Sequence, residues 1–394
     1  MANINYKSLK EKSVLLIARE DITRSPRPSR ALKLFLDSGC TVDLIGYSLK
    51  EETKAKLIYD LDRKLNVYTN LCQIISFLML IVMQKLNLRK WKEVYWLKRH
   101  NLNNILQIGI KDKYDYIMIF DIYFLPLIAS IKKTHNFVSI FDIRECYPLQ
   151  SENSLLFKLF EKKIRKDILS LYLNKINIAI TVSYGLKKYY EDNYNVECDV
   201  ILSVPYKSNV NKSYHGERIR IVHHGVANSN REIENMIDII NLLPEKYSLD
   251  LYLNGNNKYI QFLKSYSPSS RIKFNNPISF AKIIDTISKY DLGIIYFKPT
   301  TFNLLHCMPN KFFEYIQAKV PVVIGPSPDM LQIIRKYEIG FSSNEFSVQS
   351  MVDTINSINS NDLKRASYNC SSASAFFSWE AESNKFQKLL TSEI

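Results

Sequence analysis

Short apolar runs alternate with amphipathic segments along the first half of the chain. Residues 13–18 form an apolar run typical of a buried strand, and residues 29–38 carry apolar side chains at helical spacing before Gly39 ends the predicted helix. Further predicted strands are residues 41–46, 116–120, 137–141, 178–182 and 199–202. Strands that alternate with helices indicate an α/β domain whose parallel sheet is covered on both faces.

The same pattern starts again after a polar stretch at residues 205–217, which is rich in Ser, Asn, Lys and Tyr. It predicts strands at residues 219–225, 249–253, 271–274 and 291–296, and helices at residues 231–243 and 280–289. Two successive series of this kind predict two Rossmann-like domains that face each other across a cleft. We therefore expect domains at residues 1–208 and 214–375, followed by a terminal helix within residues 376–394.

Length and composition narrow the class of protein. The chain has 394 residues, of which 46% are hydrophobic, as in an ordinary globular protein of two domains. Its 53 basic and 39 acidic residues give a formal net charge of +14, which favours an anionic partner such as a nucleotide, an acidic membrane or a nucleic acid. The basic residues are spread along the chain without a nucleic-acid-binding motif, so we expect no nucleic-acid partner. The six cysteines stand apart without metal-ligand spacing, so we expect no metal site.

Residues 70–99 are candidates for contact with a membrane. The apolar run at residues 74–83 is too short to span a bilayer, which needs about 20 residues, but basic residues and two tryptophans follow it as far as Arg99. This composition is typical of a segment that lies in the membrane interface. A core helix with a solvated basic continuation is the alternative. The N-terminus lacks the apolar core of a signal peptide, so we expect a cytoplasmic protein at the inner face of the cytoplasmic membrane.

The segment around Pro309 carries the clearest candidate chemistry. Pro309 precedes good helix formers, and residues 320–324 are typical of a buried strand, so a short helix is predicted between them. Free N–H groups and a positive dipole end at the start of such a helix favour a phosphate. Pro309, Asn310 and Lys311 are therefore candidates to bind a diphosphate, and Glu314, one turn further on, is placed to accept hydrogen bonds from a ribose. An ordinary helix–strand unit is the alternative.

Other candidates in the second half of the chain could complete a phosphate site. His224 and Gly225 end a predicted strand, and a glycine lets the backbone approach a ligand closely. Arg231 offers a fixed positive charge for a pyrophosphate, and Lys298 adds a second basic side chain. A surface arginine at the start of an exposed helix is the alternative for Arg231.

Acidic residues in the first half follow two predicted strands. Asp121 follows the strand at residues 116–120, and Asp142 and Glu145 lie at the end of the next one, with Arg144 between them. Ligands of open α/β sheets bind at the carboxyl ends of the strands, so these acidic residues are candidate catalytic groups. Strand-end capping and an internal Arg–Asp ion pair are the alternatives.

These segments resemble the sugar-nucleotide-dependent glycosyltransferases of the GT-B fold, above all family 4 and its relatives in bacterial surface-polysaccharide synthesis. Residues 309–323 resemble the family's "PNKxFEY…A…PVV" segment, and residues 141–145 resemble its "YDxHE" segment. Residues 181–183 match a "TVS" landmark, and Trp379 and Glu380 match a "WE" pair near the start of the closing helix. The resemblance implies a GT-B fold whose C-terminal helix crosses back to the first domain.

The resemblance also implies an activity. The protein would move a sugar from a nucleotide-sugar donor, with a UDP-sugar favoured, to a glycan or lipid-linked acceptor in capsule, lipopolysaccharide or exopolysaccharide synthesis. Family members retain the anomeric configuration. Arg231, Lys311 and the helix that starts after Pro309 would stabilise the charge on the leaving diphosphate, so neither a metal nor another cofactor is expected.

Three positions depart from the family pattern. Phe120 and Arg144 stand where histidines are usual. His306 stands where the family has the earlier of two glutamates, the one that contacts the transferred sugar, and Glu314 is the later one. His306 is therefore a further candidate catalytic residue, with a buried hydrogen-bonded histidine as the alternative. These departures support the alternative function of a catalytically inactive GT-B-like partner or sugar-binding subunit.

Overall fold

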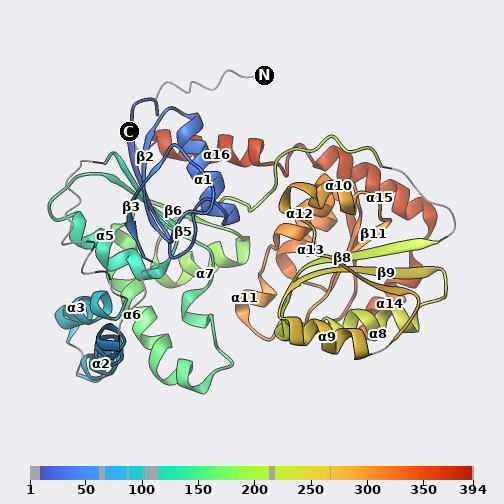
Figure 1. The fold of residues 1–394 in the computed structure, drawn as a ribbon, viewed down its shortest axis with the longest axis horizontal. Helices are drawn as coiled ribbons and strands as arrows, with labels where there is room; N and C mark the ends of the chain where they lie inside the picture. Colours follow the sequence, from blue (N-terminus) through green and yellow to red (C-terminus); the bar gives the residue numbers. More distant parts are fainter. Residues whose placement is uncertain are drawn as a thin grey trace. The chain divides into compact units, whose positions relative to one another are not determined.

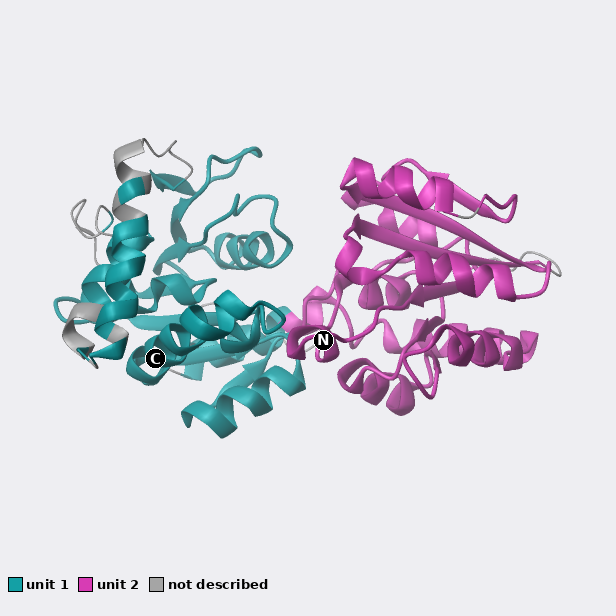
Figure 2. Cartoon of the chain, turned by 90° about the horizontal axis from the view of Figure 1, so that it is seen from below, with its two compact units in different colours: residues 1–201, 383–394 teal, residues 202–382 magenta. Residues whose placement is uncertain are grey.

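The chain forms two compact units, which Figure 2 shows in different colours. The computed structural model describes residues 9–61, 67–86, 88–100, 102, 105, 114–212, 218–266 and 268–392. The first unit comprises residues 1–201 and 383–394, and the second comprises residues 202–382. Leu202 and Glu382 are the first and last residues of the second unit, and the N–H of Leu202 donates to the carboxylate of Glu382 over 2.8 Å.

The first unit is built on a parallel sheet of seven strands in the order β3-β2-β1-β4-β5-β6-β7 (Figure 1). These strands are β1 (Ser13–Ile17), β2 (Thr41–Gly46), β3 (Lys56–Asp60), β4 (Tyr116–Ile119), β5 (Val138–Ile143), β6 (Ile178–Thr181) and β7 (Cys198–Val200). The helices are α1 (Pro26–Asp37), α2 (Val67–Lys85), α3 (Arg89–Arg99), α5 (Leu125–Ile131), α6 (Lys162–Tyr172) and α7 (Tyr184–Tyr194), and a π-helical turn, Phe157–Glu161, precedes α6. The central strand β4 is buried along its whole length, as expected for a parallel sheet covered on both faces.

The last helix of the chain, α16 (Trp379–Ser392), returns to the first unit. Phe386 packs edge-on against Phe35 of α1 with ring centroids 6.3 Å apart, and both side chains are fully buried. The hydroxyl of Tyr116 on β4 donates to the carbonyl of Leu390 over 3.2 Å. The expected return of the C-terminal helix to the first domain is therefore confirmed.

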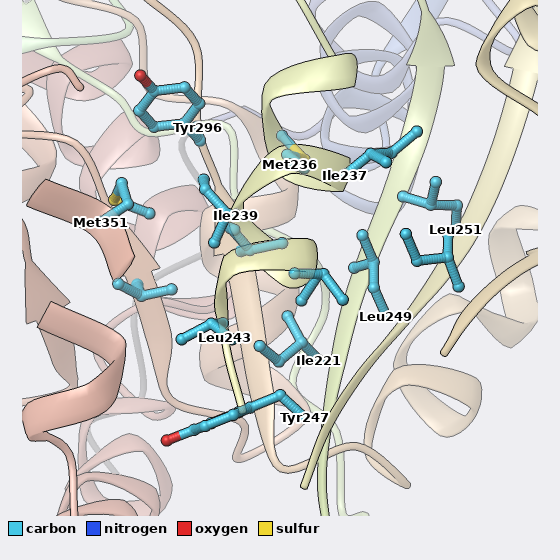
Figure 3. Packing of buried hydrophobic residues seen from close by; sticks show 14 of the residues in the cluster. Ile221, Met236, Ile237, Ile239, Leu243, Tyr247, Leu249, Leu251, Tyr296 and Met351 are labelled. Carbon is cyan, nitrogen blue, oxygen red and sulfur yellow. The ribbon is translucent and has the colours of Figure 1, made fainter. Parts of the chain in front are cut away.

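The second unit repeats the architecture with a parallel sheet of six strands in the order β10-β9-β8-β11-β12-β13. Its strands are β8 (Ile219–Ala227), β9 (Tyr247–Gly255), β10 (Ile272–Asn275), β11 (Leu292–Ile295), β12 (Val322–Ile324) and β13 (Gly340–Ser342). Its helices are α8 (Glu234–Leu242), α9 (Asn257–Tyr266), α10 (Ile283–Ile287), α11 (Phe302–Leu305), α12 (Asn310–Gln317), α13 (Pro328–Tyr337), α14 (Val348–Ser357) and α15 (Ser360–Ala373). Figure 3 shows part of its core, in which Ile221 of β8 and Leu249 of β9 pack with Met236 of α8 and Met351 of α14.

Two predicted helices differ from those observed. The helix expected at residues 231–243 is preceded by a separate 3-10 turn, Ser229–Arg231, because Glu232 adopts a left-handed conformation with φ of +46°. The helix expected at residues 280–289 is a 3-10 turn, Phe280–Lys282, followed by the short α10.

Both sheets have the strand order of a Rossmann-like unit. In the first, the order reverses between β1 and β4, and in the second between β8 and β11. Ligands of open α/β sheets bind beside this switch point, at the carboxyl ends of the strands. His223 and His224 lie on β8 beside the second switch point, and Asp121 directly follows β4 beside the first.

Candidate functional site

A buried group of polar side chains connects β8, β11 and α12 in the second unit. His223 lies on β8 at the switch point and is 3% exposed. Its Nδ1 lies 2.9 Å from the carbonyl oxygen of Ile294 on β11, and its Nε2 lies 3.2 Å from Nζ of Lys311. Because a carbonyl can only accept, Nδ1 carries the proton and Nε2 accepts from Lys311. His223 therefore orients the lysine side chain.

Lys311 is the most unusual charge of this group. Only 7% of the residue is exposed. Burial, followed by the positive charge of Arg231, lowers the pKa of Lys311 to about 7, although Glu314 and Cys307 act in the opposite direction. A lysine that is only half charged near neutral pH is a candidate functional group, because it can gain a full charge when an anion binds beside it.

His224 and Glu314 form the second pair of the group. Nε2 of His224 lies 3.4 Å from Oε2 of Glu314, and the imidazole ring meets Tyr315 edge-on at 5.5 Å between centroids. Burial, followed by Lys311, lowers the pKa of His224 to about 3. His224 is therefore neutral at physiological pH, and its contact with the glutamate is not an ion pair. The pair offers a ligand an imidazole and a carboxylate that are less than 10% exposed.

Helix α12 is held rigidly by its own side chains. Residues 311–317 are all buried. The hydroxyl of Tyr315 donates to the carbonyl of Val222 on β8 over 2.8 Å, and the amide of Gln317 donates to the carbonyls of Ser374 and Phe377. Pro309 is the N-cap residue, so the N–H groups of Asn310 and Lys311 begin the helix as the sequence predicts.

The remaining predicted donor-site residues fall into two groups. Gly225 has φ of +130°, and a Cβ atom at this position would lie 3.0 Å from Nζ of Lys311, so the backbone of β8 passes close to the lysine. Arg231 is partly buried, and its charge acts on the pKa of both Lys311 and His223. Lys298 is exposed in the loop after β11, and no contact among the described residues joins its side chain to the buried group.

His306 follows the short helix α11 and is hydrogen-bonded to an aspartate. Its Nδ1 lies 2.7 Å from Oδ2 of Asp329, which is 3% exposed in the first turn of α13. The ring also packs against Phe302, with centroids 4.4 Å apart and the two ring planes tilted by 40°. The imidazole keeps 19% of its side chain exposed. This contact matches the buried hydrogen-bonded histidine that the sequence left open as the alternative for His306, although the ring stays partly exposed.

Two candidate acids in the first unit come together at the ends of neighbouring strands. Asp121 follows β4 and Glu145 follows β5, and these strands pair side by side. Burial raises the pKa of Asp121 to about 6, and Arg144 acts against this. Burial also raises the pKa of Glu145. Oδ1 of Asp121 and Oε2 of Glu145 are buried without a hydrogen-bond partner among the described residues, so both can accept from a ligand.

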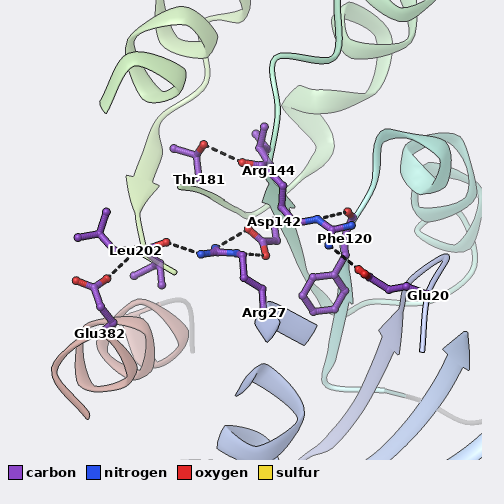
Figure 4. Close-up of polar contacts among 10 residues, drawn as sticks. Glu20, Arg27, Phe120, Asp142, Arg144, Thr181, Leu202 and Glu382 are labelled. Atoms are coloured by element: carbon purple, nitrogen blue, oxygen red, sulfur yellow. Dashed lines mark hydrogen bonds and ion pairs between the residues drawn. The ribbon is translucent and has the colours of Figure 1, made fainter. Parts of the chain in front are cut away.

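Asp142 has a different environment, which Figure 4 shows. Its two carboxylate oxygens accept from Nε and a terminal nitrogen of Arg27 over 2.8 and 2.7 Å, and the second terminal nitrogen of Arg27 donates to the carbonyl of Ile201. The aspartate side chain is 1% exposed. This bidentate pair is the internal Arg–Asp ion pair that the sequence left open. Arg144 likewise binds Glu20 and the carbonyl of Phe120, so it fixes the end of β4.

Several residues of these two places carry no signal in the sequence. His223 precedes the predicted His224 and contacts Lys311 from 88 positions away. Asp329 has no sequence feature that marks it as a site residue, and only its contact with His306 in the structure identifies it. In the first unit, Arg165 of α6 partly offsets the rise in pKa that burial causes at both Asp121 and Glu145. Within the described part of the chain, no three His, Cys, Asp or Glu side chains gather closely enough to hold a metal ion.

Comparison with known proteins shows the fold. No family model and no curated protein matches the chain. A sucrose-phosphate synthase from Thermosynechococcus elongatus superimposes with a TM-score of 0.68 at 12% identity, over 97% of this chain and 99% of that one. The lipopolysaccharide outer core galactosyltransferase WaaB gives 0.65 at 10% identity over 97% and 100%, and HepE of Anabaena, solved with UDP and glucose, gives 0.67 at 12% identity over 97% and 100%. The chain therefore has the GT-B fold.

Proposed function

We propose that this protein is a glycosyltransferase that moves a sugar from a nucleotide-sugar donor to a glycan or lipid-linked acceptor. A fold alone does not determine activity, so the proposal depends on the site. The observation that carries it is the buried Lys311, held by His223 beside Arg231 at the first turn of α12, in the unit where the sequence predicts donor binding.

The donor site is suited to a diphosphate. The first N–H groups of α12 and the side chains of Lys311 and Arg231 supply positive charge where negative charge gathers on the leaving diphosphate. We propose that these groups stabilise the leaving group without a metal or another cofactor. Glu314 would accept hydrogen bonds from the ribose. A UDP-sugar is the favoured donor, and the binding of UDP by HepE, a protein of the same fold, supports this choice.

The acceptor hydroxyl is proposed to bind at Asp121 and Glu145 of the first unit. Their unsatisfied buried oxygens can accept its proton or its hydrogen bond. The ion-paired Asp142 is left out of this group, because Arg27 occupies both of its oxygens. We propose that transfer retains the anomeric configuration, which NMR of the product tests. Inversion would instead assign Asp121, with its raised pKa, as the general base.

A donor screen tests the proposal. Thermal-shift measurements with UDP-, GDP-, CMP- and ADP-sugars should identify one that stabilises the protein, because a ligand that binds the native state raises its melting temperature. Hydrolysis or transfer of that donor should be lost in Glu314→Ala and kept in the control Glu345→Ala, whose side chain is exposed in the same unit. No stabilisation by any of these donors would refute the proposal. Binding without hydrolysis or transfer would instead support an inactive sugar-binding subunit, which His306 in the place of a glutamate also favours.

We also propose that the protein associates with the inner face of an anionic cytoplasmic membrane, as expected for an enzyme of bacterial surface-polysaccharide synthesis. Helix α2 supports this, because one of its faces is apolar and exposed while Ser76 and Leu80 face inward. Each of the outward side chains is 43–58% exposed, and they recur every three or four residues: Leu71, Ile74, Ile75, Leu78 and Val82. Among the described residues, no helix has the length and apolarity to cross a bilayer. Of the predicted segment 70–99, the side chains of Trp91 and its basic neighbours lie outside the described residues.

A further inference from the structure

Three leucines project from the turn that precedes α6. Leu155, Leu156 and Leu159 are 70%, 69% and 61% exposed, more than any apolar side chain of α2 that the structure describes. Exposed leucines are individually common, but three of them within five residues form an apolar patch of the kind that marks an interaction site. The sequence alone does not identify this patch, because it does not show which apolar residues of the segment face outward.

The turn is fixed by the residues that face inward. Phe157 is 6% exposed, and the guanidinium of Arg165 lies over its ring at 5.1 Å. Glu161, the last residue of the π-helical turn, pairs with Arg99 of α3 and with Arg165. A π-helical turn places one extra residue in the helix and often occurs at functional sites. The leucines are therefore displayed on a supported turn and not on a loose loop.

The same contacts connect the turn to α2. The guanidinium of Arg99 lies 4.0 Å from the ring centroid of Phe77 on α2 and also pairs with Glu161. Helix α2 packs against both α3 and α6, and Figure 1 shows the three helices together in the first unit. The leucine turn and α2 are thus connected by direct contacts within the first unit.

Exposed lysines lie in the same segment as the leucines. Lys158, Lys163 and Lys166 are exposed along the turn and the start of α6. A second copy of this chain docked through the same face would bring these lysines together, and like charges disfavour such a contact. An anionic lipid surface would pair with the lysines and accept the leucines at the same time.

We propose that residues 154–166 form a second membrane anchor, in which Leu155, Leu156 and Leu159 insert into an anionic bilayer beside α2. This inference rests on the membrane association proposed above. One apolar element gives weak and reversible binding, and stable attachment needs two signals. The leucine turn supplies the second signal and fixes the rotation of the first unit on the lipid surface.

Flotation with vesicles tests the anchor in the full-length protein. The triple variant Leu155→Ser/Leu156→Ser/Leu159→Ser should bind vesicles of phosphatidylcholine and phosphatidylglycerol roughly tenfold or more weakly than the wild type. A matched control removes three exposed apolar side chains of the second unit, which are 57%, 46% and 62% exposed, in Leu242→Ser/Phe262→Ser/Phe376→Ser. This control should bind like the wild type. Lys158→Glu/Lys163→Glu should lose the preference for phosphatidylglycerol over phosphatidylcholine alone.

The outcomes separate this inference from the proposed activity. Circular dichroism and the thermal shift produced by UDP should be the same in the triple variant and the wild type, because the leucines belong to the first unit and the donor-site residues belong to the second. Wild-type protein that does not bind the vesicles, a triple variant that binds them fully, or a control that fails equally would each overturn the anchor. So would light scattering that shows a wild-type dimer and a monomeric triple variant with unchanged vesicle binding, since the leucines would then cover a second copy.

Discussion

The buried amine of Lys311 should couple nucleotide binding to proton uptake. Its pKa is lowered to about 7 by burial and by Arg231. A diphosphate bound at the first turn of α12 adds negative charge beside the amine, which favours its protonated form and raises its pKa toward the ordinary value of 10.5. We therefore expect UDP to bind together with a proton.

The pH dependence follows from the lowered pKa. A group with a pKa of about 7 is about half deprotonated at pH 7 and about 90% deprotonated at pH 8. Proton uptake should accordingly rise from about 0.5 to about 0.9 per UDP over this interval, and the affinity should fall by up to tenfold for each further pH unit, approximately as proton linkage requires. The neighbouring His223 and His224 have pKa values lowered by burial, so both are neutral throughout this range in the free protein.

Isothermal titration calorimetry measures this uptake directly. UDP is titrated at about pH 8, above the second pKa of a phosphate near 6, in two buffers that differ in ionisation enthalpy. The slope of the observed enthalpy against the buffer enthalpy gives the number of protons. Lys311→Met should bind UDP weakly and without proton uptake. UDP binding by the wild type without a proton at pH 8, or unchanged uptake in Lys311→Met, would refute the reasoning.

The same lowered pKa predicts a change in stability with pH. In the unfolded chain Lys311 titrates near its ordinary 10.5, and in the folded protein near 7. Between these values the unfolded state binds more protons, so the free energy of unfolding rises with pH in this window. Below pH 7 the amine is charged in the folded protein, so the full free-energy cost of burying this charge lowers the free energy of unfolding. Each unit of pKa difference corresponds to about 1.4 kcal/mol in the free energy of unfolding. Lys311→Met should therefore stabilise the ligand-free protein by several kcal/mol at pH 7, although it impairs UDP binding.

Three further predictions concern the other polar groups. Asp121→Asn should abolish the fall in the transfer or hydrolysis rate that we expect below about pH 6 in the wild type, and an unchanged pH profile would exclude Asp121 as the titrating group. Arg27→Met should lower the free energy of unfolding in urea by about 3–5 kcal/mol, because it leaves the carboxylate of Asp142 buried without a cation. UDP affinity should not change in this variant, and a parallel loss of affinity would contradict a purely structural role. Gly225→Ala should weaken UDP binding about tenfold or more in calorimetry, since it strains a backbone at φ of +130° and displaces Lys311; wild-type affinity would show that the close approach is not needed.

The sequence predicts the fold well where residues are buried on both faces of a sheet. The strands at residues 13–18, 116–120 and 178–182 are predicted within a residue or two, because a short continuous apolar run between turn residues is typical of a buried parallel strand. β3 is not predicted, because all but one of its residues are half-buried at the sheet edge and its sequence, Lys-Leu-Ile-Tyr-Asp, mixes polar and apolar positions. The break at Glu232, after the 3-10 turn Ser229–Arg231, is hidden by a helix-like pattern, since the left-handed conformation of a glutamate cannot be identified from its neighbours.

The candidate site is predictable only where it is local in sequence. Proline, lysine and glutamate within residues 309–314 indicate a helix start with its charged groups, and the structure places them together. Contacts between distant residues have no such signal: Arg27 lies 115 positions before Asp142, and Asp329 lies 23 positions after His306. The catalytic and donor-binding roles of these residues stay predictions that the variants above test.

The energetics of α12 favour the predicted binding site over an ordinary helix–strand unit. A buried amine that is deprived of a full charge destabilises the fold, and an apolar side chain such as Met would fill the same space without this cost. The position nevertheless combines a lysine with a histidine that orients it, a glycine that makes room for it and an arginine that opposes its charge. Glu314 acts to raise the pKa of Lys311, but the pKa stays at about 7, below the ordinary 10.5. Positive potential from Arg231 therefore remains around the amine. A helix that served only to cover the sheet would gain nothing from this arrangement, whereas a diphosphate would supply the missing negative charge.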